Sequence, residues 1–472
     1  MSLIGLELSD AGIIAAAGEP ARLLEVDGQA TESSGFALPQ KGGVLVGKAA
    51  ESQAHIFPRQ TLNGFWDQLN IEPIKALGQY SLQNHAEIAY NHLALIWQHI
   101  QKHGDTIVMA VPSFYDREQL GLILGITGEL SMPLRGFIPQ ALSASSQEYP
   151  DNMHLHLDIH LHRIEVIYLK QEKNYTIEDS LTAADKGLIQ LYRDWVETIA
   201  KKFVGKTRFD PLHQAASEQE LYDRLPEVLS HFQHHPSMVF EISAAAASYS
   251  ITLKRDLITR KVESIYKQLV RLISKIRKKH GKDKSPLTLQ LTHRLTRLPG
   301  LKEKLATVKG AQIIELDQGA AALGVLGIWN RISKQSNGEG VSFFTSLPLK
   351  NTQRLDTQEP SAEKAGSVLP THILYRGIAY PITERPLIIG LEIDPENSGI
   401  QIYGRTNGIS RKHCSIELRG REIVLNDYSK SESFVDEIRV NESMVLKLGQ
   451  MIRIGTPGEK LQLIACLNSD ET

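Results

Sequence analysis

Polar and apolar side chains alternate along one stretch of this chain, MHLHLDIHLHRIEVIYL, which runs from Met153 to Leu169. Because successive side chains of a β-strand point to opposite faces, this alternation predicts a strand. One face of the strand then carries the polar residues His154, His156, Asp158, His160 and His162. We expect the chain to turn near residues 159–162, so that the stretch forms a hairpin.

The histidine face has two interpretations. Imidazole and carboxylate groups at alternating positions could bind zinc or a similar ion. However, the expected turn separates the groups before it from those after it, and no cysteine lies nearby in the sequence. We therefore expect no metal site, and we interpret the stretch as a partly exposed strand that carries histidines.

The first 330 residues alternate between short apolar strands and amphipathic helices, which is typical of an α/β fold. In the first half we expect strands within 3–16, 43–47 and 106–112, and helices within 85–103 and 116–128. The second half begins at the histidine stretch and continues with helices at 187–203, 217–229, 256–279 and 318–332, and strands at 238–242, 248–253, 287–292 and 311–316. Two α/β halves of similar length suggest a duplicated fold with a cleft between them.

Composition limits the compartment and the partners. The formal net charge is -2, and the two cysteines are Cys414 and Cys466. A charge near zero gives no general attraction to nucleic acid, and two cysteines are too few for a disulfide framework. No apolar run reaches the length of a membrane-spanning helix. We expect a cytoplasmic protein with no nucleic-acid partner and no membrane insertion.

The composition changes after Arg331. Residues 331–370 are rich in Ser, Thr, Gly, Pro and Gln, which is typical of a linker. Their one apolar run, Val341–Phe344, either docks onto the first domain or forms a short strand. Residues 371–472 show short strands separated by turns, the pattern of an all-β sandwich. The expected domains are therefore 1–330 and 371–472, joined by a linker over 331–370.

Four stretches of the first domain resemble successive landmarks of one protein family. They are VLVGKAAESQA (44–54), AVPSFYDREQ (110–119), RLTRLPGLKEKL (294–305) and ELDQGAAALG (315–324). In order and spacing they are similar to the ATPase domain of the heat-shock-seventy chaperones. The resemblance implies an α/β actin-like ATPase fold, in which two ribonuclease-H-like lobes surround a nucleotide cleft.

The residues that serve this family's chemistry are replaced here. The first phosphate loop, Asp-Leu-Gly-Thr-Thr, is matched by Glu7-Leu8-Ser9-Asp10-Ala11, in which Asp10 would repel phosphate. The second loop, Asp-Leu-Gly-Gly-Gly-Thr, is matched by residues 158–163, where histidines fill space that glycine leaves open. The family's lysine, glutamate and adenosine-binding Gly-Gly are matched by Trp66, Ile138 and His293-Arg294.

These replacements bear directly on catalysis. Phosphoryl transfer depends on positioning and on electrostatic stabilisation, so their combined effect should be the loss of ATP hydrolysis. We expect a pseudo-ATPase with no catalytic residue and no cofactor. Candidate remnants of the nucleotide cleft are Glu7, Asp158, Gly319 and Gly324. The alternative is a divergent chaperone-like ATPase that binds ATP or ADP with magnesium in a rearranged cleft.

The last domain, from Thr371 to about Ala465, resembles forkhead-associated (FHA) domains, which bind phosphothreonine peptides. The family's Ser-x-x-His signature is present as Ser410-Arg411-Lys412-His413. The resemblance implies that Ser410 binds phosphate and that His413 braces the loop. The family's Gly-Arg is Gly390-Leu391 here, and its Asn-Gly is replaced within 429–433. Because leucine cannot bind phosphate, Arg405, Arg411 or Lys412 would have to replace that arginine.

Two hypotheses of function follow. In the first, the protein is a non-catalytic scaffold or adaptor, in which a pseudo-ATPase domain is joined to an FHA-like module that binds a protein partner, with or without phosphothreonine. In the second, it is the divergent ATP-binding enzyme. The replaced phosphate loops favour the first hypothesis.

Overall fold

The computed structural model describes most of the chain in two compact units. The described residues are 2–74, 82–145, 149, 152–172, 174–184, 186–244, 247–282, 285–333, 340–348, 369–375, 378–393, 399–402, 408–420, 422–429, 433–436, 438–455 and 458–464. Unit 1 comprises Met1–Phe114, Pro139–Ile328 and Ser346–Leu349, and unit 2 comprises Tyr115–Ile138, Trp329–Thr345 and Lys350–Thr472, in each case as far as these residues are described. Much of the expected linker, at 334–339 and 349–368, lies outside the described residues.

The first sheet of unit 1 contains β1 (Leu3–Glu7), β2 (Ile14–Ala17), β3 (Arg22–Leu23) and β6 (Thr106–Val111). β1 pairs antiparallel with β2 and parallel with β6, and β3 extends the sheet beyond β2. The strands β1, β2 and β6 are buried almost throughout, as their apolar sequences predict.

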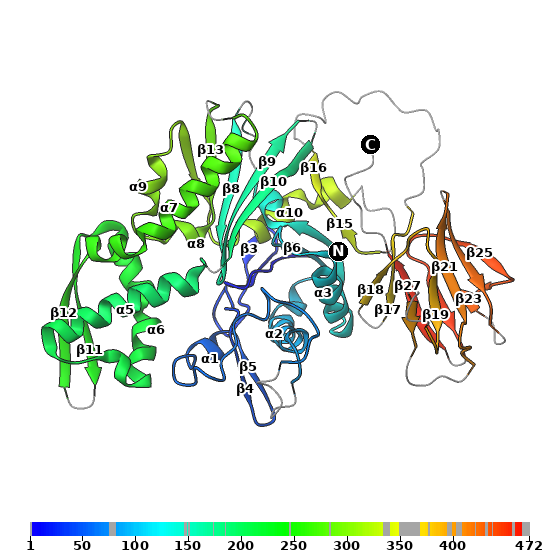
Figure 1. Ribbon diagram of the computed structural model, residues 1–472, viewed down its shortest axis with the longest axis horizontal. Coiled ribbons are helices and arrows are strands. Elements are labelled where there is room, and N and C mark those ends of the chain that lie inside the picture. The colour runs from blue at the N-terminus through cyan, green and yellow to red at the C-terminus, as the bar shows by residue number, and fades with distance from the viewer. Residues whose placement is uncertain are drawn as a thin grey trace. The chain divides into compact units, whose positions relative to one another are not determined.

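The second sheet of unit 1 repeats this arrangement with longer antiparallel strands (Figure 1). β8 (Met153–Ile159) pairs antiparallel with β9 (Arg163–Gln171), which pairs antiparallel with β10 (Asn174–Ala184). On its other side, β8 pairs parallel with β13 (Leu287–Leu291), which pairs parallel with β14 (Ala311–Glu315). The short strand β16 (Ser346–Pro348) pairs with β10 at the edge. In both sheets an antiparallel meander is thus continued by parallel strands.

Helices and two hairpins complete unit 1. The hairpins are β4 (Ala37–Gln40) with β5 (Gly43–Val46), and β11 (Ser237–Ala244) with β12 (Ala247–Lys254). The helices are α1 (Lys48–Glu51), α2 (His85–Ile100), η2 (Gln101–His103), α4 (Gln140–Ser143), α5 (Leu188–Thr207), η3 (Pro211–His213), α6 (Ala215–His234), α7 (Arg255–Lys279), α8 (His293–Thr296), α9 (Leu301–Ala306) and α10 (Ala320–Ile332), whose last residues belong to unit 2.

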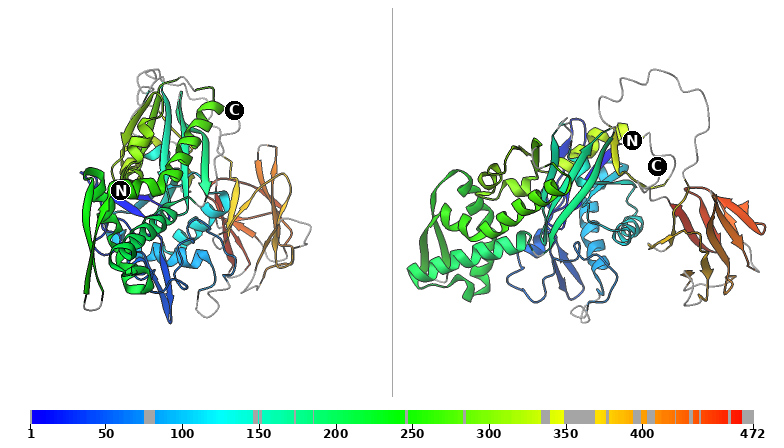
Figure 2. Two further views of the ribbon diagram at one scale, coloured as in Figure 1. Left: turned by 60° about the vertical axis from the view of Figure 1, so that its left-hand side comes forward. Right: turned by 45° about the horizontal axis from the view of Figure 1, so that its top comes forward.

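The long helices of unit 1 follow the apolar pattern of the sequence. α7 buries residues at helical spacing, among them Ile258, Val262, Ile265 and Leu269, and contacts β9 and β10. α5 and α6 contact the β11–β12 hairpin, as Figures 1 and 2 show. Among the described residues, no helix combines the length and apolar character needed to cross a membrane.

Unit 2 contains α3 (Arg117–Glu129), β7 (Leu134–Pro139) and the short strand β15 (Ser342–Phe343). β15 lies within the apolar run Val341–Phe344 and pairs parallel with β7, with Phe343 opposite Phe137. The run therefore forms a short strand, and that strand docks onto β7.

The C-terminal strands of unit 2 form two sheets. One has the order β18-β17-β27-β26-β23-β24 and the other β20-β19-β21-β22-β25. The strands are β17 (His372–Tyr375), β18 (Ile378–Pro381), β19 (Leu387–Gly390), β20 (Gly399–Gln401), β21 (Cys414–Arg419), β22 (Glu422–Asp427), β23 (Ser433–Val435), β24 (Ile438–Arg439), β25 (Ser443–Leu446), β26 (Met451–Ile454) and β27 (Glu459–Ile464). Ile389 and Ile416 of one sheet share a buried core with Ile452 and Leu461 of the other. The predicted all-β sandwich is confirmed.

Candidate functional site

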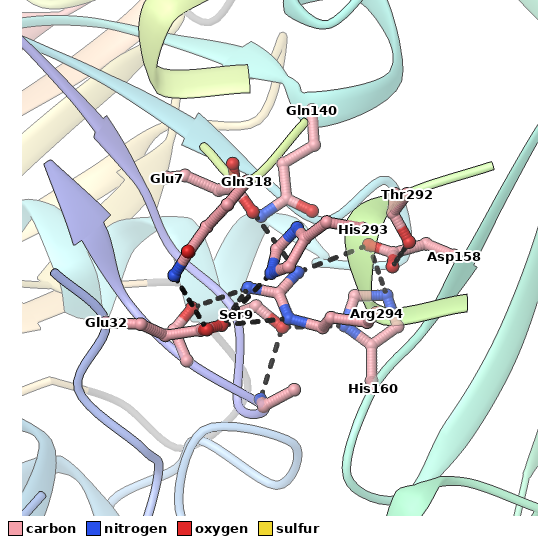
Figure 3. Close-up of polar contacts among 12 residues, drawn as sticks. Glu7, Ser9, Glu32, Gln140, Asp158, His160, Thr292, His293, Arg294 and Gln318 are labelled. Atoms are coloured by element: carbon pink, nitrogen blue, oxygen red, sulfur yellow. Dashed lines mark hydrogen bonds and ion pairs between the residues drawn. The ribbon is translucent and has the colours of Figure 1, made fainter. Parts of the chain in front are cut away.

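A buried arginine lies among carboxylates from both halves of unit 1. Arg294 belongs to α8, directly after β13, and its side chain is 4% exposed. Its Nη1 lies 3.1 Å from Oε1 of Glu7, and its Nη2 lies 3.0 Å from Oε1 of Glu32 and donates to the carbonyl of Gly12 at 3.0 Å. Nη1 also lies 3.9 Å from Oδ2 of Asp158. Figure 3 shows the guanidinium surrounded by these carboxylates.

Two of the carboxylates around Arg294, Glu32 and Asp158, are held in their charged form. Burial raises the pKa of Glu32, but the charge of Arg294 and the contact with His293 outweigh burial, so the pKa falls to about 2. Burial also opposes ionisation of Asp158, but His160 and Arg294 outweigh it and hold its pKa below the ordinary value. Arg294 itself remains protonated, because the neighbouring carboxylates overcome the effect of burial and raise its pKa.

His160 supplies a second positive charge to the same cluster. Its Nδ1 lies 3.0 Å from Oγ of Ser9, and its Nε2 lies 3.7 Å from both Oδ2 of Asp158 and Oε2 of Glu165. Burial lowers the pKa of a histidine, but these carboxylates and Asp10 outweigh burial here and raise the pKa of His160. The hairpin turn that follows β8 therefore places a cation among carboxylates.

Two further contacts join the N-terminal strand to the rest of this cluster. The backbone N–H of Leu161 donates to Oδ1 of Asp10 at 2.9 Å, and Nε2 of Gln140 donates to the carbonyl of Leu8 at 2.6 Å. Thr292 donates to Oδ1 of Asp158 at 2.6 Å. The residues that match the two phosphate loops are thus bonded to one another and to Arg294.

Little space remains inside this cluster. A cavity lined by Glu7, Asp158 and His293 has a volume of about 10 Å³, roughly the room for a single water. Arg294 and Glu32 also line a larger cavity of about 590 Å³, whose walls include neither Glu7 nor Asp158. The cluster can therefore hold the two halves of unit 1 together, but it leaves no room for a triphosphate beside Glu7 and Asp158.

His154 and His156 of β8 and His160 directly after it are buried, so the prediction of a partly exposed strand is wrong. The exposed fractions are 0% for His154, 1% for His156 and 0% for His160. Every residue of β8 is buried, so both faces of the strand are covered, while β13 and β9 pair with its two edges. Of these histidines only His162, which lies in the turn before β9, is partly exposed, and its Nε2 contacts the carbonyl of Asn63 at 3.0 Å.

Each buried histidine has a protein partner. His154 contacts the hydroxyl of Tyr175, and Nδ1 of His156 lies 2.9 Å from Oε1 of Gln290, which also accepts a hydrogen bond from Ser145. Burial is the main cause that lowers the pKa of His154, to about 3. Within the described part of the chain, no group of three or more His, Cys, Asp or Glu residues is placed to hold a metal ion.

Trp66 and Ile138, the positions that match the lysine and glutamate of the heat-shock-seventy ATPase domain, are core residues in this protein. Trp66 is fully buried, and its Nε1 donates to Nδ1 of His92 at 3.0 Å. The other ring nitrogen of His92 therefore carries the proton and donates to Ser33 at 2.9 Å. Burial lowers the pKa of His92 to about 4, which keeps the ring neutral. Ile138 is fully buried as well.

The two glycines proposed as cleft remnants serve packing. A Cβ atom on Gly324 would lie 1.8 Å from the carbonyl oxygen of Ser143, so α10 can approach α4 closely only with glycine there. Gly319 faces the side chain of Leu23. Neither glycine lines the small cavity beside Glu7 and Asp158.

The sequence analysis did not identify Glu32, nor the role of Arg294 and His160 as cations. One signal was present: the sequence LTHRLT places a charged residue immediately after an apolar strand, where the resembled family has glycine. An arginine in such a position needs an acidic partner, but the sequence does not say which carboxylate supplies it.

In unit 2, the Ser-x-x-His segment directly precedes β21 in the chain and is hydrogen-bonded to the end of β19. Nδ1 of the fully buried His413 accepts the backbone N–H of Ser410 at 3.2 Å, and the backbone N–H of His413 donates to Ile389 at 2.8 Å. A Cβ atom on Gly390 would lie 1.9 Å from the carbonyl oxygen of Arg411, which requires glycine at this position. The structure therefore places the loop-bracing residues together, with Ser410 partly exposed.

Two exposed basic side chains directly follow Ser410 in the chain. The Arg411 side chain is 82% exposed and its Nε lies 3.5 Å from Oε1 of Glu392, while Nζ of Lys412 lies 4.3 Å from the centre of the Tyr428 ring. An exposed ion pair of this kind contributes little to stability, so Arg411 can exchange Glu392 for another anion. Arg405 and residues 430–432 lie outside the described residues.

Comparison with known protein families finds a match for one region of the chain. A family model for the FHA domain matches residues 388–455, which include Gly390 and the segment from Ser410 to His413. No curated protein matches the chain. The match supports a protein-interaction module in the C-terminal part of the chain.

Proposed function

We propose that this protein is a non-catalytic adaptor, in which a pseudo-ATPase unit carries an FHA module that captures a protein partner. The observation that carries the first part of the proposal is the ion cluster around Arg294. Its guanidinium and the imidazolium of His160 neutralise the carboxylates Glu7, Glu32 and Asp158 from within the chain.

The actin-like fold is part of this proposal. Its support is the repeated sheet topology of unit 1, in which β1-β2-β3 with β6 is matched by β8-β9-β10 with β13 and β14. In such a fold the turns after β1 and β8 would wrap the phosphates of a nucleotide. Here Asp10 and His160 occupy these turns, and Oδ1 of Asp10 lies 3.6 Å from Nδ1 of His160. The two turns therefore contact each other through protein side chains, without a nucleotide between them.

The second part of the proposal concerns the FHA module and its ligand. We assign phosphothreonine recognition to Ser410, with Arg411 and Lys412 as the cations that take the role of the missing arginine. All three lie in one short segment on the surface, and Gly390 and His413 hold that segment in place. Phosphate favours a site where a hydroxyl and two cations converge, because charge-assisted hydrogen bonds are the stronger ones.

The alternative function is that of a divergent ATP-binding, chaperone-like ATPase. The cavity of about 590 Å³ beside Arg294 is the observation in its favour. Against it stands the position of the carboxylates Glu7 and Asp158, which are bonded within the cluster and would have to lose Arg294 to accept magnesium. The adaptor is therefore the better-supported function.

The adaptor function is tested by capture of a phosphothreonine peptide library on immobilised full-length protein. We expect the native protein to retain phosphothreonine peptides, and the double substitution Ser410→Ala with Arg411→Ala to lose them. The matched control is Arg419→Ala, a 60% exposed arginine at the opposite end of β21. Equal capture by the native protein and the double variant would contradict the assignment of this site.

A further inference from the structure

A second large cavity in unit 1 has no role in the adaptor function. Its volume is about 730 Å³, and Arg294 is not among the residues that line it. One wall comes from α1 and the segment that follows it, and the opposite wall comes from α5 and α6. A volume of roughly 300–1,000 Å³ is typical of sites for small organic ligands.

The two walls are joined by direct contacts, so the cavity is formed without a ligand. Oε1 of Gln219 accepts the backbone N–H of His55 at 2.8 Å, and Nε2 of Gln219 donates to the carbonyl of Glu51 at 3.1 Å. The ring of His55 stacks on Tyr222, with 3.5 Å between ring centres and an angle of 9°. These contacts fix the positions of the side chains that face the cavity.

Carboxylates outnumber cations in the walls. Glu51, Glu197, Glu218 and Asp223 line the cavity together with two cations, Lys48 and Arg193. Oδ1 of Asp223 accepts a hydrogen bond from the neutral amide of Gln219 at 2.8 Å, which brings no positive charge. The cavity therefore attracts positively charged ligands.

Two of these carboxylates lack sufficient positive charge around them. Burial raises the pKa of Glu51, and Ser34 and Lys48 offset this only in part. Burial also raises the pKa of Glu218, whose neighbour His55 lies at 3.3 Å. Burial lowers the pKa of His55 to about 4, so that His55 is neutral near pH 7 and does not neutralise Glu218. A ligand cation would supply positive charge beside Glu51 and Glu218, where the protein provides too little.

The form of this cation follows from the other residues of the walls. Tyr192 and Tyr222 present aromatic groups, which attract organic cations, and Val196 and Leu212 present apolar groups suited to methylene carbons. A bare metal ion is not favoured, because no described group of three or more acidic or histidine side chains is close enough to bind one. Because carboxylates lie on both walls, a ligand with two separated positive charges can contact a carboxylate on each wall.

We propose that this cavity binds a linear polyamine, with its ammonium groups beside Glu51 of α1 and Glu218 of α6 and its methylene chain along Tyr192 and Tyr222. Each ammonium group donates charge-assisted hydrogen bonds to a carboxylate. The chain between the ammonium groups displaces water from the apolar part of the walls.

The test is isothermal titration of the full-length protein with spermidine. We expect saturable binding by the native protein and affinity at least about tenfold weaker, or about 1.4 kcal/mol, for Glu51→Gln combined with Glu218→Gln, because the charge-assisted hydrogen bonds to both carboxylates are lost. Octane-1,8-diol, which has the chain without the charges, should not bind. Both substitutions keep the shape of the side chain, and circular dichroism verifies that the variant folds.

The matched control is Glu263→Gln on α7, a carboxylate that is 48% exposed and does not line the cavity. Its affinity for spermidine should equal that of the native protein. Absence of binding to the native protein would overturn the proposal, and so would an equal loss of affinity in Glu263→Gln and in the double variant, which would indicate attraction to surface charge in general. Neither outcome depends on capture of a partner through Ser410.

Discussion

Replacing Arg294 by alanine removes the central cation of the buried cluster and leaves its carboxylates without their partner. Glu7 is 6% exposed and Asp158 is 3% exposed, so water cannot replace the guanidinium at either of them. Removal of one partner from a buried ion pair costs about 3–5 kcal/mol, because the remaining charge is left desolvated. We expect Arg294→Ala to lower the free energy of unfolding by this amount.

The assay is equilibrium unfolding in urea, followed by tryptophan fluorescence and by circular dichroism, for the native protein and the variant at neutral pH. The matched control is Arg297→Ala, since Arg297 lies on the same segment and contacts Glu32 at 4.0 Å but is 59% exposed. An exposed pair contributes about 0–1 kcal/mol, so the control should unfold almost as the native protein does. A loss below about 1 kcal/mol for Arg294→Ala, equal to that of the control, would refute the cluster as a stabilising element.

Three further predictions concern pH and packing. Because Arg294 outweighs burial and lowers the pKa of Glu32 to about 2, Glu32 contributes stability above about pH 4.5 that is lost as the pH falls toward 2. Urea unfolding across this pH range should therefore show a flatter pH dependence of stability for Glu32→Gln than for the native protein. Because the folded chain raises the pKa of His160, the protonated ring contributes stability that is complete below about pH 6.5 and is lost as the pH rises through the pKa of the folded state. In the same urea assay, His160→Gln should lack this loss of stability at higher pH. Identical pH profiles for the variant and the native protein would refute a charged His160. Gly390→Ala places a Cβ atom 1.9 Å from the carbonyl oxygen of Arg411 and should lower the free energy of unfolding of the FHA module by about 1–3 kcal/mol, as measured by calorimetry. An unchanged thermal unfolding transition would show that the loop can shift to accept the methyl group.

Periodic patterns predicted the secondary structure well. The helix expected at 256–279 is α7 (Arg255–Lys279), and the expected turn after Ile159 is the turn between β8 and β9. Such elements depend on local alternation or on helical spacing, which a single sequence displays directly. The pattern of short strands after Thr371 likewise predicted the sandwich.

Burial and long-range partners could not be predicted in this way. Alternation in β8 reveals which side chains share a face, but it does not reveal that both faces of the strand are buried. The partner of His156, Gln290, lies 134 positions away, and the partner of Arg294, Glu32, lies 262 positions away. No local motif encodes pairs at such separation, so the ion cluster became visible only in the folded chain.

In the proposed pseudo-ATPase unit, the protein's own side chains occupy the place of a nucleotide. Isothermal titration of the full-length protein with ATP and with ADP, each with magnesium, tests it most directly. We predict no binding up to millimolar nucleotide, because Arg294 and His160 already neutralise Glu7 and Asp158 and the space beside these carboxylates is about 10 Å³. Saturable binding at micromolar nucleotide would contradict the account and would favour the ATP-binding enzyme.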